Sequence, residues 1–472
     1  AGLAIHWRQE AEKERYVYAV GGVSNEDRTL CTNDADVMTT CAAILERMIY
    51  AKVGGRLIRR NCNGYNHYNE AIGEFKMRVV RAIGRTCVPV DPQEFVDSYT
   101  GRKKAIYQNN LSEFLDDGVK RCHALLRTFM KVEKVPWNKS PRCIQPRHPV
   151  YNIGLGRYLK HMEKPLFRAV SKVFGQKYTV FKGLNANEMG SELRSLWDRY
   201  NVPVAVGLDA SRFDASVDVG LLEWEHSLYN MLYRDKELKR LLRMQLHNIG
   251  VAYCYDGKIK YHTSGGRGSG DMNTSLGNSL IMCAVVWTWL QQCGVRASLA
   301  NNGDDCVVIM EAEDYSRFSA GFEEFTLSLG FTMVVEAPVY DFEGVEFCQT
   351  HPVWVNGWRM IRNYSTAREK DSLCLFPLAD EGALRSWLFA VGECGLSLTS
   401  GVPIFQEFYI AYMRNGKTSK MSDAVFMQSG SRMLARGMEA KYETITPDTR
   451  VSFYKAFGVT PDEQTAMEEY YS

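Results

Sequence analysis

The sequence predicts a protein of mixed α and β structure, an α/β chain of the α+β kind. One observation is a pair of β-prone apolar runs, the first ending at Asp209 and the second flanking a turn at 301–305. Another is an apolar helix over 280–290, and a third is helical apolar spacing over 384–393 and 404–413. At 472 residues and 45% hydrophobic, the chain is long enough for two or three subdomains around a large core.

The segment from Asn301 to Asp305 reads Asn-Asn-Gly-Asp-Asp and lies between apolar runs at 297–300 and 306–310. An Asn-Gly pair between such runs is a strong hairpin signal, so we predict strand, turn, strand. The hairpin tip would present two adjacent carboxylates, Asp304 and its neighbour. Alone, the Gly-Asp-Asp triplet is weak evidence, because a solvated turn would read the same.

A second acidic segment begins with a β-prone run that ends in Asp209. Two-metal nucleotidyl transfer uses two Mg²⁺ or Mn²⁺ ions about 3.5–4 Å apart, and such hard cations prefer carboxylate oxygens. We therefore predict that Asp209 and Asp304 bridge both ions. Asp305 would lie beside them, and the Ala210 carbonyl would be a further ligand. A structural carboxylate cluster that binds no metal is the alternative.

Between the two acidic segments, a Gly/Ser-rich segment at 264–278 leads into the apolar helix. Thr274 and Asn278 are four residues apart and share one helix face, while Ser269 precedes them on the loop. Together with Asp214, these side chains offer polar groups to a ribose 2′-hydroxyl. A Gly-rich linker before a capped helix is the competing interpretation.

These three segments, in this order, resemble motifs A, B and C of viral RNA-dependent RNA polymerases: Asp-x4-Asp, Ser-Gly-x3-Thr-x3-Asn and Gly-Asp-Asp. The spellings over 269–278 and 300–306 are similar to those of Tombusviridae, plant positive-strand RNA viruses. The resemblance implies a right-hand polymerase of fingers, palm and thumb, closed by fingertips, with the N-terminal segment bridging fingers and thumb. It also implies RNA-dependent RNA polymerase activity by two-metal-ion nucleotidyl transfer, with primer-independent initiation.

The resemblance extends to a basic segment at 131–147, which is similar to motif F, where the family places basic residues over the incoming triphosphate. Lys131, Lys139 and Arg142 are therefore predicted to contact the nucleotide. The last two are charge-assisted donors suited to phosphate oxygens, and three prolines favour an extended loop. A generic basic surface loop is the competing interpretation.

Residues 345–349 resemble motif E, the hairpin that in this family grips the growing 3′ end. A buried hairpin without a nucleic-acid role would look the same. From the resemblance, Gly270, Cys348 and Gln349 are predicted to contact RNA. The region similar to motif D, 318–340, contains no lysine, so the sequence does not identify a general acid for pyrophosphate.

Charge is unevenly distributed along the chain. Residues 51–200 hold 28 lysines and arginines against 13 aspartates and glutamates, although the net charge of the chain is only +2. A basic region for template phosphates and an acidic region for metal suit template copying. Arg102, Lys103 and Lys104 have a tyrosine on either side, which suits phosphate contact and base stacking. A solvated turn is the competing interpretation.

From the motifs, we divide the chain into fingers and fingertips at 1–200, a palm at 201–360 and a thumb at 361–472. A fingers insertion into the palm is expected near 235–262. A Gly/Ser/Pro break at 395–403 is expected to separate the two C-terminal helices.

The longest apolar stretch is shorter than the roughly 20 residues that span a bilayer, and we expect no signal peptide before the fold. The thirteen cysteines include no Cys-x-x-Cys pair, which is typical of a reducing cytosol. The resemblance implies template and product RNA, ribonucleoside triphosphates, other viral replication proteins and host factors as partners. It implies the host cytoplasm, in membrane-associated replication complexes formed through regions or partners outside this chain.

Two other function classes compete with this reading. A reverse transcriptase or DNA polymerase would use the same palm, but such enzymes commonly place a bulky side chain where the 2′-hydroxyl falls, and Asp214 is polar. A catalytically silent RNA-binding scaffold would not need the carboxylates Asp209, Asp304 and Asp305, nor the cations Lys139 and Arg142.

Overall fold

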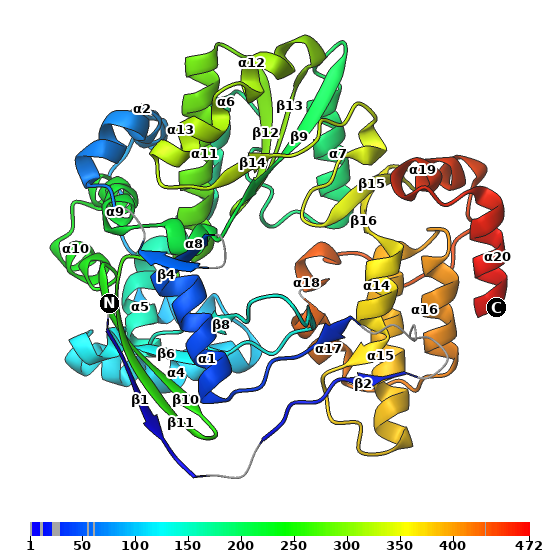
Figure 1. The fold of residues 1–472 in the computed structure, drawn as a ribbon, viewed down its shortest axis with the longest axis horizontal. Coiled ribbons are helices and arrows are strands. Elements are labelled where there is room, and N and C mark those ends of the chain that lie inside the picture. The colour runs from blue at the N-terminus through cyan, green and yellow to red at the C-terminus, as the bar shows by residue number, and fades with distance from the viewer. Residues whose placement is uncertain (1, 10–12, 21–28, 54–55, 60–61, 430) are drawn as a thin grey trace.

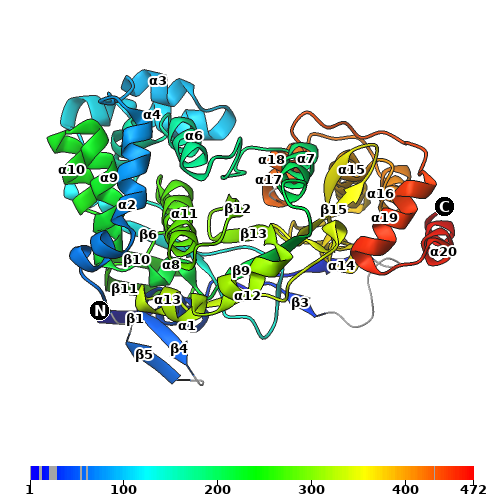
Figure 2. The same ribbon diagram turned by 90° about the horizontal axis from the view of Figure 1, so that it is seen from above.

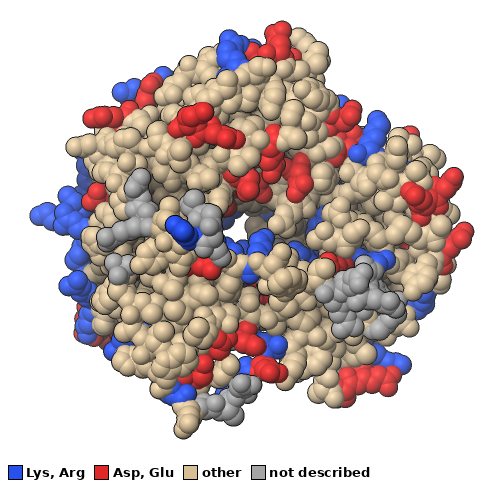
Figure 3. Space-filling model, in the orientation of Figure 1, with Lys and Arg blue, Asp and Glu red and all other residues tan. Residues whose placement is uncertain are grey.

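The structure is a computed structural model that describes all residues except 1, 10–12, 21–28, 54–55, 60–61 and 430. Helices and strands are mixed throughout the chain (Figure 1), as the sequence predicts. In the same orientation, the surface is hollowed near its centre, with acidic side chains above the hollow and basic side chains below it (Figure 3).

The central element is a four-stranded antiparallel sheet in the order β12-β13-β9-β14. Its strands are β9 (Pro203–Ala210), β12 (Ala297–Asn302), β13 (Asp305–Glu311) and β14 (Met333–Val335). The predicted strands on both sides of the Gly-Asp-Asp turn are therefore confirmed. Val204, Val206 and Leu208 alternate along β9 and are buried in the main core, which fixes the face toward which the strand turns.

The predicted apolar helix is present and longer than expected, as α11 (Thr274–Cys293). It is apolar on all sides and almost wholly buried, which is the pattern of a helix inside a core. Three helices surround it in the main core: α2 (Tyr65–Ile83), α6 (Glu163–Phe174) and α9 (Val219–Tyr233). Figure 2 shows α11 between α2 and α9 on one side and the central sheet on the other. Helix α11 thus supports the sheet whose strand ends carry the carboxylates.

A second sheet joins segments that lie far apart in the sequence, in the order β1-β11-β10-β6-β8. Its strands are β1 (Gly2–Trp7), β6 (Leu126–Met130), β8 (Cys143–Ile144), β10 (His247–Cys254) and β11 (Gly257–Ser264). Helix α1 (Val37–Ile44) packs on one face of it through Val37 and Ile44. The region near 235–262 therefore contributes two strands to a sheet built with N-terminal residues.

The N-terminal segment forms two further strand pairs. β2 (Tyr18–Ala19) pairs with β17 (Leu373–Cys374), and β3 (Leu30–Cys31) pairs with β7 (Val135–Pro136). Along the lower edge of Figure 1, this segment runs from β1 toward the C-terminal helices. The N-terminal segment therefore pairs both with the basic segment at 131–147, through β7, and with the C-terminal part, through β17.

The remaining elements before residue 345 are mostly short. They are η1 (Leu45–Ile49), β4 (Tyr50–Val53), β5 (Arg56–Arg59), α3 (Pro92–Asp97), α4 (Gly101–Asp117), η2 (Arg121–Ala124), α5 (Pro149–Leu159), α7 (Ala186–Trp197), α8 (Phe213–Ser216), α10 (Lys236–Arg243), η3 (Ala312–Asp314), α12 (Tyr315–Ser319), α13 (Phe322–Ser328) and η4 (Phe342–Gly344). Asp91, Asn185 and Asp235 cap α3, α7 and α10 by accepting backbone N–H groups, as short polar residues do at helix starts.

The C-terminal part consists of a hairpin followed by helices around their own core. The elements are β15 (Thr350–Trp354), β16 (Trp358–Arg362), α14 (Tyr364–Asp371), α15 (Glu381–Thr399), α16 (Phe405–Arg414), α17 (Ser422–Ser429), α18 (Ser431–Leu434), α19 (Pro447–Phe457) and α20 (Pro461–Tyr471). None of the helices in the described residues is long and apolar enough to cross a membrane.

The predicted break at 395–403 is wrong in its first half, because α15 continues through Gly395 to Thr399. A Cβ at Gly395 would lie 2.2 Å from ring atoms of Tyr409 on α16. The glycine therefore allows two helices to approach closely, and the chain turns only after residue 399. Local composition does not distinguish a glycine that ends a helix from one that lets a helix pack.

Candidate active site

The Gly-Asp-Asp turn lies at the tip of the β12–β13 hairpin. Asn302 pairs with Asp305, so the turn residues are Gly303 and Asp304, one position later than the Asn-Gly signal suggests. Gly303 has φ +66°, which suits the first position of a two-residue hairpin turn. Asn301 Nδ2 donates to the Gly303 carbonyl at 2.8 Å, and the Gly303 N–H donates to Ser279 Oγ of α11 at 3.1 Å. The tip is thus held from two sides.

The predicted carboxylates stand at neighbouring positions at the ends of β9 and of the β12–β13 hairpin. Leu208 pairs with Cys306, so Asp209 follows on β9 next to the place where Asp305 begins β13. Asp304 is exposed toward a cavity, and its pKa is raised by reduced solvation and by the charges of Asp214 and Asp209. A carboxylate whose pKa is raised by neighbouring carboxylates favours a bound cation.

Asp305 is half-buried, and burial together with the Asp304 charge raises its pKa to about 6. The Cys348 N–H donates to Asp305 Oδ2 at 2.9 Å and opposes that rise. Cys348 and Gln349 both have left-handed φ, +52° and +60°, in the turn between Phe347 and Thr350. Left-handed backbone costs non-glycine residues about 1–2 kcal/mol each, so this turn is held in place by contacts such as the one to Asp305.

Asp214 and Asn278 are in direct contact. Asn278 Nδ2 donates to Asp214 Oδ1 at 2.8 Å, and Asn278 Oδ1 accepts from Arg267 Nε at 2.9 Å. Arg267 forms an ion pair with Glu225 of α9, and both side chains are fully buried. Burial raises the pKa of Asp214, against the opposing effects of the Asn278 hydrogen bond and of Arg267.

A cavity of about 320 Å³ brings the acidic and basic segments face to face. Six of the predicted site residues line it: Lys131, Arg142, Ala210, Asp214, Ser269 and Asp304. Three arginines to which the sequence analysis assigned no role line it as well: Arg47, Arg212 and Arg267. The cavity thus combines carboxylates with five cationic side chains, which suits a phosphorylated ligand held together with metal ions.

The predicted phosphate donors are engaged with a carboxylate. Arg142 binds Glu133 through Nε at 2.7 Å and through a second guanidinium nitrogen, and Lys131 Nζ lies 3.1 Å from the same carboxylate. Lys139 does not line the cavity. It is exposed in the turn after β7, and its charge helps to lower the pKa of Lys370 on α14, behind the larger effect of burial.

The hydroxyl groups of Ser269 and Thr274 form hydrogen bonds that hold the Gly/Ser segment in place. Ser269 Oγ lies 2.8 Å from Gln145 Oε1, and Thr274 Oγ1 donates to the Gly268 carbonyl. A Cβ at Gly270 would lie 2.7 Å from the Gln145 carbonyl, so only glycine fits where the loop passes the basic segment. Thr274 and Asn278 lie on one face of α11, as predicted, but only Asn278 contacts Asp214.

Arg102, Lys103 and Lys104 lie in the first turn of α4. Lys104 pairs with Asp97 at 2.9 Å. The part of the prediction that assigned base stacking to the flanking tyrosines is wrong for Tyr107, which is 4% exposed and packs in the core beside α5. Aromatic spacing near basic residues did not reveal that the ring faces inward.

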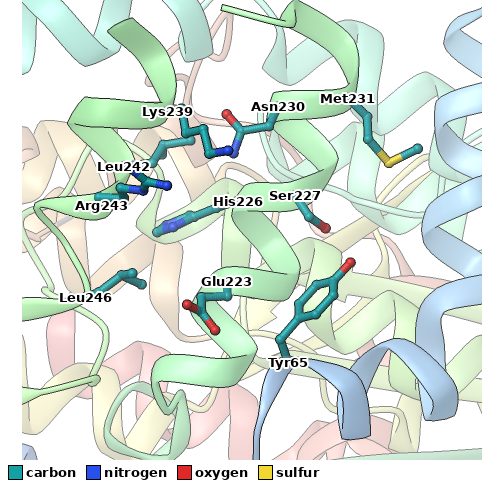
Figure 4. Close-up of a pocket in the computed structure, with 10 residues that line it drawn as sticks. All are labelled: Tyr65, Glu223, His226, Ser227, Asn230, Met231, Lys239, Leu242, Arg243 and Leu246. Carbon is teal, nitrogen blue, oxygen red and sulfur yellow. The ribbon is translucent and has the colours of Figure 1, made fainter. Parts of the chain in front are cut away.

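Two other candidate sites do not coincide with the predicted residues. A hollow of about 530 Å³ between the start of α2, α9 and α10 is lined by residues such as His226 and Arg243 (Figure 4). Burial lowers the pKa of His226 to about 4 and keeps it neutral. None of the predicted site residues lines this hollow.

In the described part of the chain, the one group of three or more potential ligand atoms within 4.8 Å of one another is Glu113, His123 and His148. Each histidine accepts a backbone N–H at Nδ1, from Lys120 at 2.9 Å and from Val150 at 3.2 Å. A neutral imidazole then carries its proton on Nε2 and has no lone pair there for a metal. By the same criterion, Asp209, Asp304 and Asp305 do not form such a group in the described residues.

Sequence reasoning missed the buried pair of Arg267 and Glu225. Arg267 stands in the Gly/Ser segment without a distinguishing pattern, and Glu225 is one of two glutamates, with Glu223, in the mostly apolar helix α9. A buried charge requires a partner, but the sequence alone does not show that Glu225 is buried while Glu223 is exposed. The identity of that partner depends on the packing of α9 against the loop.

Known proteins match almost the whole chain. The family described as viral RNA dependent RNA polymerase matches residues 3–472. The RNA-directed RNA polymerase of Tobacco necrosis virus (strain A) is 44% identical over 390 residues, which make up 81% of this chain and 54% of that protein. The RNA-directed RNA polymerase of Cymbidium ringspot virus is 39% identical over 97% of this chain and 56% of that protein. The RNA-directed RNA polymerase of Maize chlorotic mottle virus is 37% identical over 99% of this chain and 49% of that protein.

The chain spans about half the length of the curated relatives it matches. The resemblance to Tombusviridae polymerases that motifs A, B and C indicated is confirmed by these matches, which extend well beyond the motifs. The chain belongs to the viral RNA dependent RNA polymerase family.

Proposed function

We propose that this chain copies viral RNA as an RNA-directed RNA polymerase, by two-metal-ion nucleotidyl transfer and with primer-independent initiation. The observation that carries the proposal is the cavity in which Asp304 and Asp214 face Lys131 and Arg142. A template-directed polymerase must hold a triphosphate and a metal-activated hydroxyl in one place, and this cavity offers groups for both.

Asp209 and Asp304 are proposed to hold two Mg²⁺ or Mn²⁺ ions, with Asp305 and the Ala210 carbonyl as further ligands. The oxygen-only donor set and the raised pKa of Asp304 fit such ions. When bound, the ions would activate the 3′-hydroxyl and stabilise the leaving pyrophosphate. The hairpin tip orients Asp304, and the Cys348 N–H orients Asp305.

Lys131, Lys139 and Arg142 are proposed to contact the triphosphate. Glu133 forms ion pairs with Lys131 and Arg142, so phosphate oxygens would replace this carboxylate as their partner on binding. The Glu133 carboxylate and a phosphate are both anionic acceptors of charge-assisted hydrogen bonds, so this exchange would not require the backbone that lines the cavity to change. Lys139 would reach the phosphates only after a movement of its exposed turn.

The ribose 2′-hydroxyl is proposed to meet Asp214 and Asn278, with Ser269 or Thr274 nearby. The contact between Asp214 and Asn278 supports the first pair. Ser269 lines the cavity, whereas the Thr274 hydroxyl is used within the loop. Of the two hydroxyls, Ser269 is therefore the better candidate.

We propose fingers and fingertips at 1–200, a palm at 201–360 with a fingers insertion near 235–262, and a thumb at 361–472. The strand pairs made by the N-terminal segment support a closed hand. The insertion's two strands pair with β1 and β6, which supports their assignment to the fingers.

RNA contacts are proposed for three places in this hand: the basic turn at 102–104, the loop at Gly270, and the hairpin turn at Cys348 and Gln349. Template and product RNA and ribonucleoside triphosphates are the proposed partners, beside other viral replication proteins and host factors. The proposed location is the host cytoplasm, in membrane-associated complexes formed through regions or partners outside this chain.

An unprimed RNA template incubated with four ribonucleotides and Mg²⁺ or Mn²⁺ tests the proposal. We expect template-length product on a denaturing gel, dependent on the divalent ion and on all four nucleotides. Product only from a primed template would refute primer-independent initiation. Absence of product from primed and unprimed templates alike would refute the polymerase assignment.

A further inference from the structure

An ion pair excluded from solvent lies next to the contact between Asp214 and Asn278. A guanidinium nitrogen of Arg267 binds Glu225 Oε1, and the two side chains are 1% and 0% exposed. Glu225 stands on α9, whereas Arg267 stands in the Gly/Ser segment that precedes α11. A buried ion pair adds little net stability compared with apolar side chains of the same volume. Stability alone therefore does not explain why the main core holds these two charges.

Glu225 is held in one orientation by three donors. Besides Arg267, Asn273 Nδ2 donates to Glu225 Oε2 at 2.8 Å, and the Tyr229 hydroxyl donates to the same oxygen at 2.7 Å. Gln245 Nε2 donates to Asn273 Oδ1 at 2.9 Å, which fixes the Asn273 amide in turn. Both carboxylate oxygens of Glu225 are thus occupied, and the side chain cannot turn without leaving buried donors unpaired. Glu225 is therefore a fixed acceptor for the guanidinium.

The direction of these hydrogen bonds continues from the ion pair to Asn278. An arginine guanidinium only donates, so the Asn278 atom that lies 2.9 Å from Arg267 Nε is the amide oxygen Oδ1. The amide nitrogen then faces Asp214 and donates to its Oδ1 at 2.8 Å. The two ends of an asparagine amide are nearly equal in shape, and their hydrogen-bond partners decide which end faces which way. Here Arg267 decides the orientation.

The backbone of the same arginine holds the segment that carries Asp214. The Arg267 N–H donates to the Asp214 carbonyl at 2.7 Å, and the Gly266 N–H donates to the Val217 carbonyl at 2.7 Å. Arg267 also lines the cavity, where its Nη1 is buried and has no hydrogen-bond partner among the described residues. A buried donor without a partner costs free energy, so its presence beside the cavity favours a role in the site over a role in packing.

Gly277 provides the space for the ion pair against α11. A Cβ at this position would overlap both the Glu225 carboxylate and the Arg267 guanidinium. Glycine inside a helix is less favourable than alanine, so this residue type is explained by the pair that it admits. Gly277 directly precedes Asn278, and the ion pair therefore packs against the helix turn that carries the proposed sugar contact.

We propose that Glu225 and Arg267 are positioning residues for sugar selection, which fix the Asn278 amide so that its nitrogen faces Asp214 and the incoming ribose. A 2′-hydroxyl can then donate to the Asp214 carboxylate and accept from the second N–H of the Asn278 amide. Neither bond forms with deoxyribose. Glu225 does not line the cavity and acts only through Arg267 and Asn278. The inference deepens the proposed function and rests on it, because it requires a nucleotide in the cavity.

Two substitutions perturb the ion pair without changing Asn278 or Asp214. Glu225→Gln removes the charge that orients Arg267, and Gly277→Ala displaces the pair from α11 without removing a polar group. The measurement is the ratio of kcat/KM for ATP to kcat/KM for dATP opposite the same template base. We expect both variants to narrow this ratio by about fivefold, the equivalent of one hydrogen bond. ATP incorporation should slow, whereas dATP incorporation should change little.

A double variant tests whether Glu225 acts through Asn278. In the Asn278→Ala background, Glu225→Gln should not change the ATP to dATP ratio further, because the amide to be oriented is absent. The matched control is Glu468→Gln, which neutralises a buried glutamate that is paired with Arg450 at 2.7 Å in the C-terminal helices. This control should keep the wild-type ratio even if its melting temperature falls.

Equilibrium affinities for ATP and dATP, measured by calorimetry with Mn²⁺, make the test independent of turnover. The wild-type ratio in Glu225→Gln or in Gly277→Ala, an equal narrowing in Glu468→Gln, or a further narrowing in the double variant would overturn the inference. A wild-type protein that does not prefer ATP in turnover or in binding would overturn it as well. A wild type that binds ATP more tightly than dATP but forms no product would refute the polymerase activity alone, and narrower affinity ratios in the two variants would still support the positioning role.

Discussion

Replacing Asn278 with alanine tests how the cavity selects the sugar. In the structure, Asn278 Nδ2 donates to Asp214 at 2.8 Å and its Oδ1 accepts from Arg267 Nε at 2.9 Å. The substitution removes both bonds and leaves a buried guanidinium nitrogen without a partner. It also raises the pKa of Asp214 further, because the lost bond is the largest effect that opposes burial there.

The magnitude follows from the bonds that are lost. A polar group left unsatisfied in a buried site costs about 1–3 kcal/mol, which corresponds to roughly tenfold in discrimination for each 1.4 kcal/mol. We therefore expect Asn278→Ala to narrow the preference for ATP over dATP by about tenfold, mainly by slowing ATP incorporation. Deoxynucleotide incorporation should change less, because it never used the contact.

The assay measures single-nucleotide incorporation of ATP and dATP opposite the same template base and compares their kcat/KM values. Thr288→Ala, on the same helix α11 but away from the cavity, is the control for helix stability. An unchanged ATP to dATP ratio in Asn278→Ala, with slower incorporation of both, would refute the reasoning and assign Asn278 a structural role only.

Four further predictions concern the cavity and the packing of α15 against α16. Asp304→Asn should abolish nucleotide addition while RNA affinity, measured by anisotropy, stays within about twofold of wild type, because the basic surfaces are intact. Arg142→Ala should weaken nucleotide use by about tenfold or more in single-nucleotide kinetics, because a charge-assisted donor is lost, with little effect on RNA binding. Because the pKa of Asp305 is raised to about 6, Mn²⁺ affinity measured by calorimetry should fall as the pH decreases through 6, since the protonated carboxyl is a poor ligand. Gly395→Ala should lower the free energy of unfolding by about 1–3 kcal/mol in a urea titration, because the new Cβ would overlap the Tyr409 ring.

Matched variants control for these changes. Asp314→Asn neutralises a carboxylate that is paired with Arg317, and Lys177→Ala removes a cation that is paired with Glu192; neither residue lines the cavity. Gly64→Ala adds a Cβ where nothing lies within 4 Å.

Normal nucleotide addition by Asp304→Asn would contradict the two-metal assignment. Equal loss of RNA and nucleotide binding in Arg142→Ala would place Arg142 outside the triphosphate site. Unchanged Mn²⁺ affinity from pH 7 to pH 5 would remove Asp305 from the ligand set, and wild-type stability of Gly395→Ala would contradict the packing argument.

The sequence by itself determined the elements whose signal is local. Alternating or continuous apolar residues predicted β9, the β12–β13 hairpin and α11, and the order of three short motifs was enough to indicate the family. Periodicity and turn chemistry act over a few residues, so one sequence suffices to read them. The candidate carboxylates Asp209, Asp304 and Asp305 follow from those elements, because each stands at a strand end.

Only the tertiary structure decided contacts between segments that are distant in sequence. The pairing of β10 and β11 with β1 and β6, the burial of Tyr107 and the ion pair of Glu225 with Arg267 all depend on such contacts. Gly395 shows the same limit, since a glycine that breaks a helix and one that admits a neighbouring ring read alike. Local residues specify which face of an element is apolar, but the partner that covers this face is chosen by the packing of the whole chain.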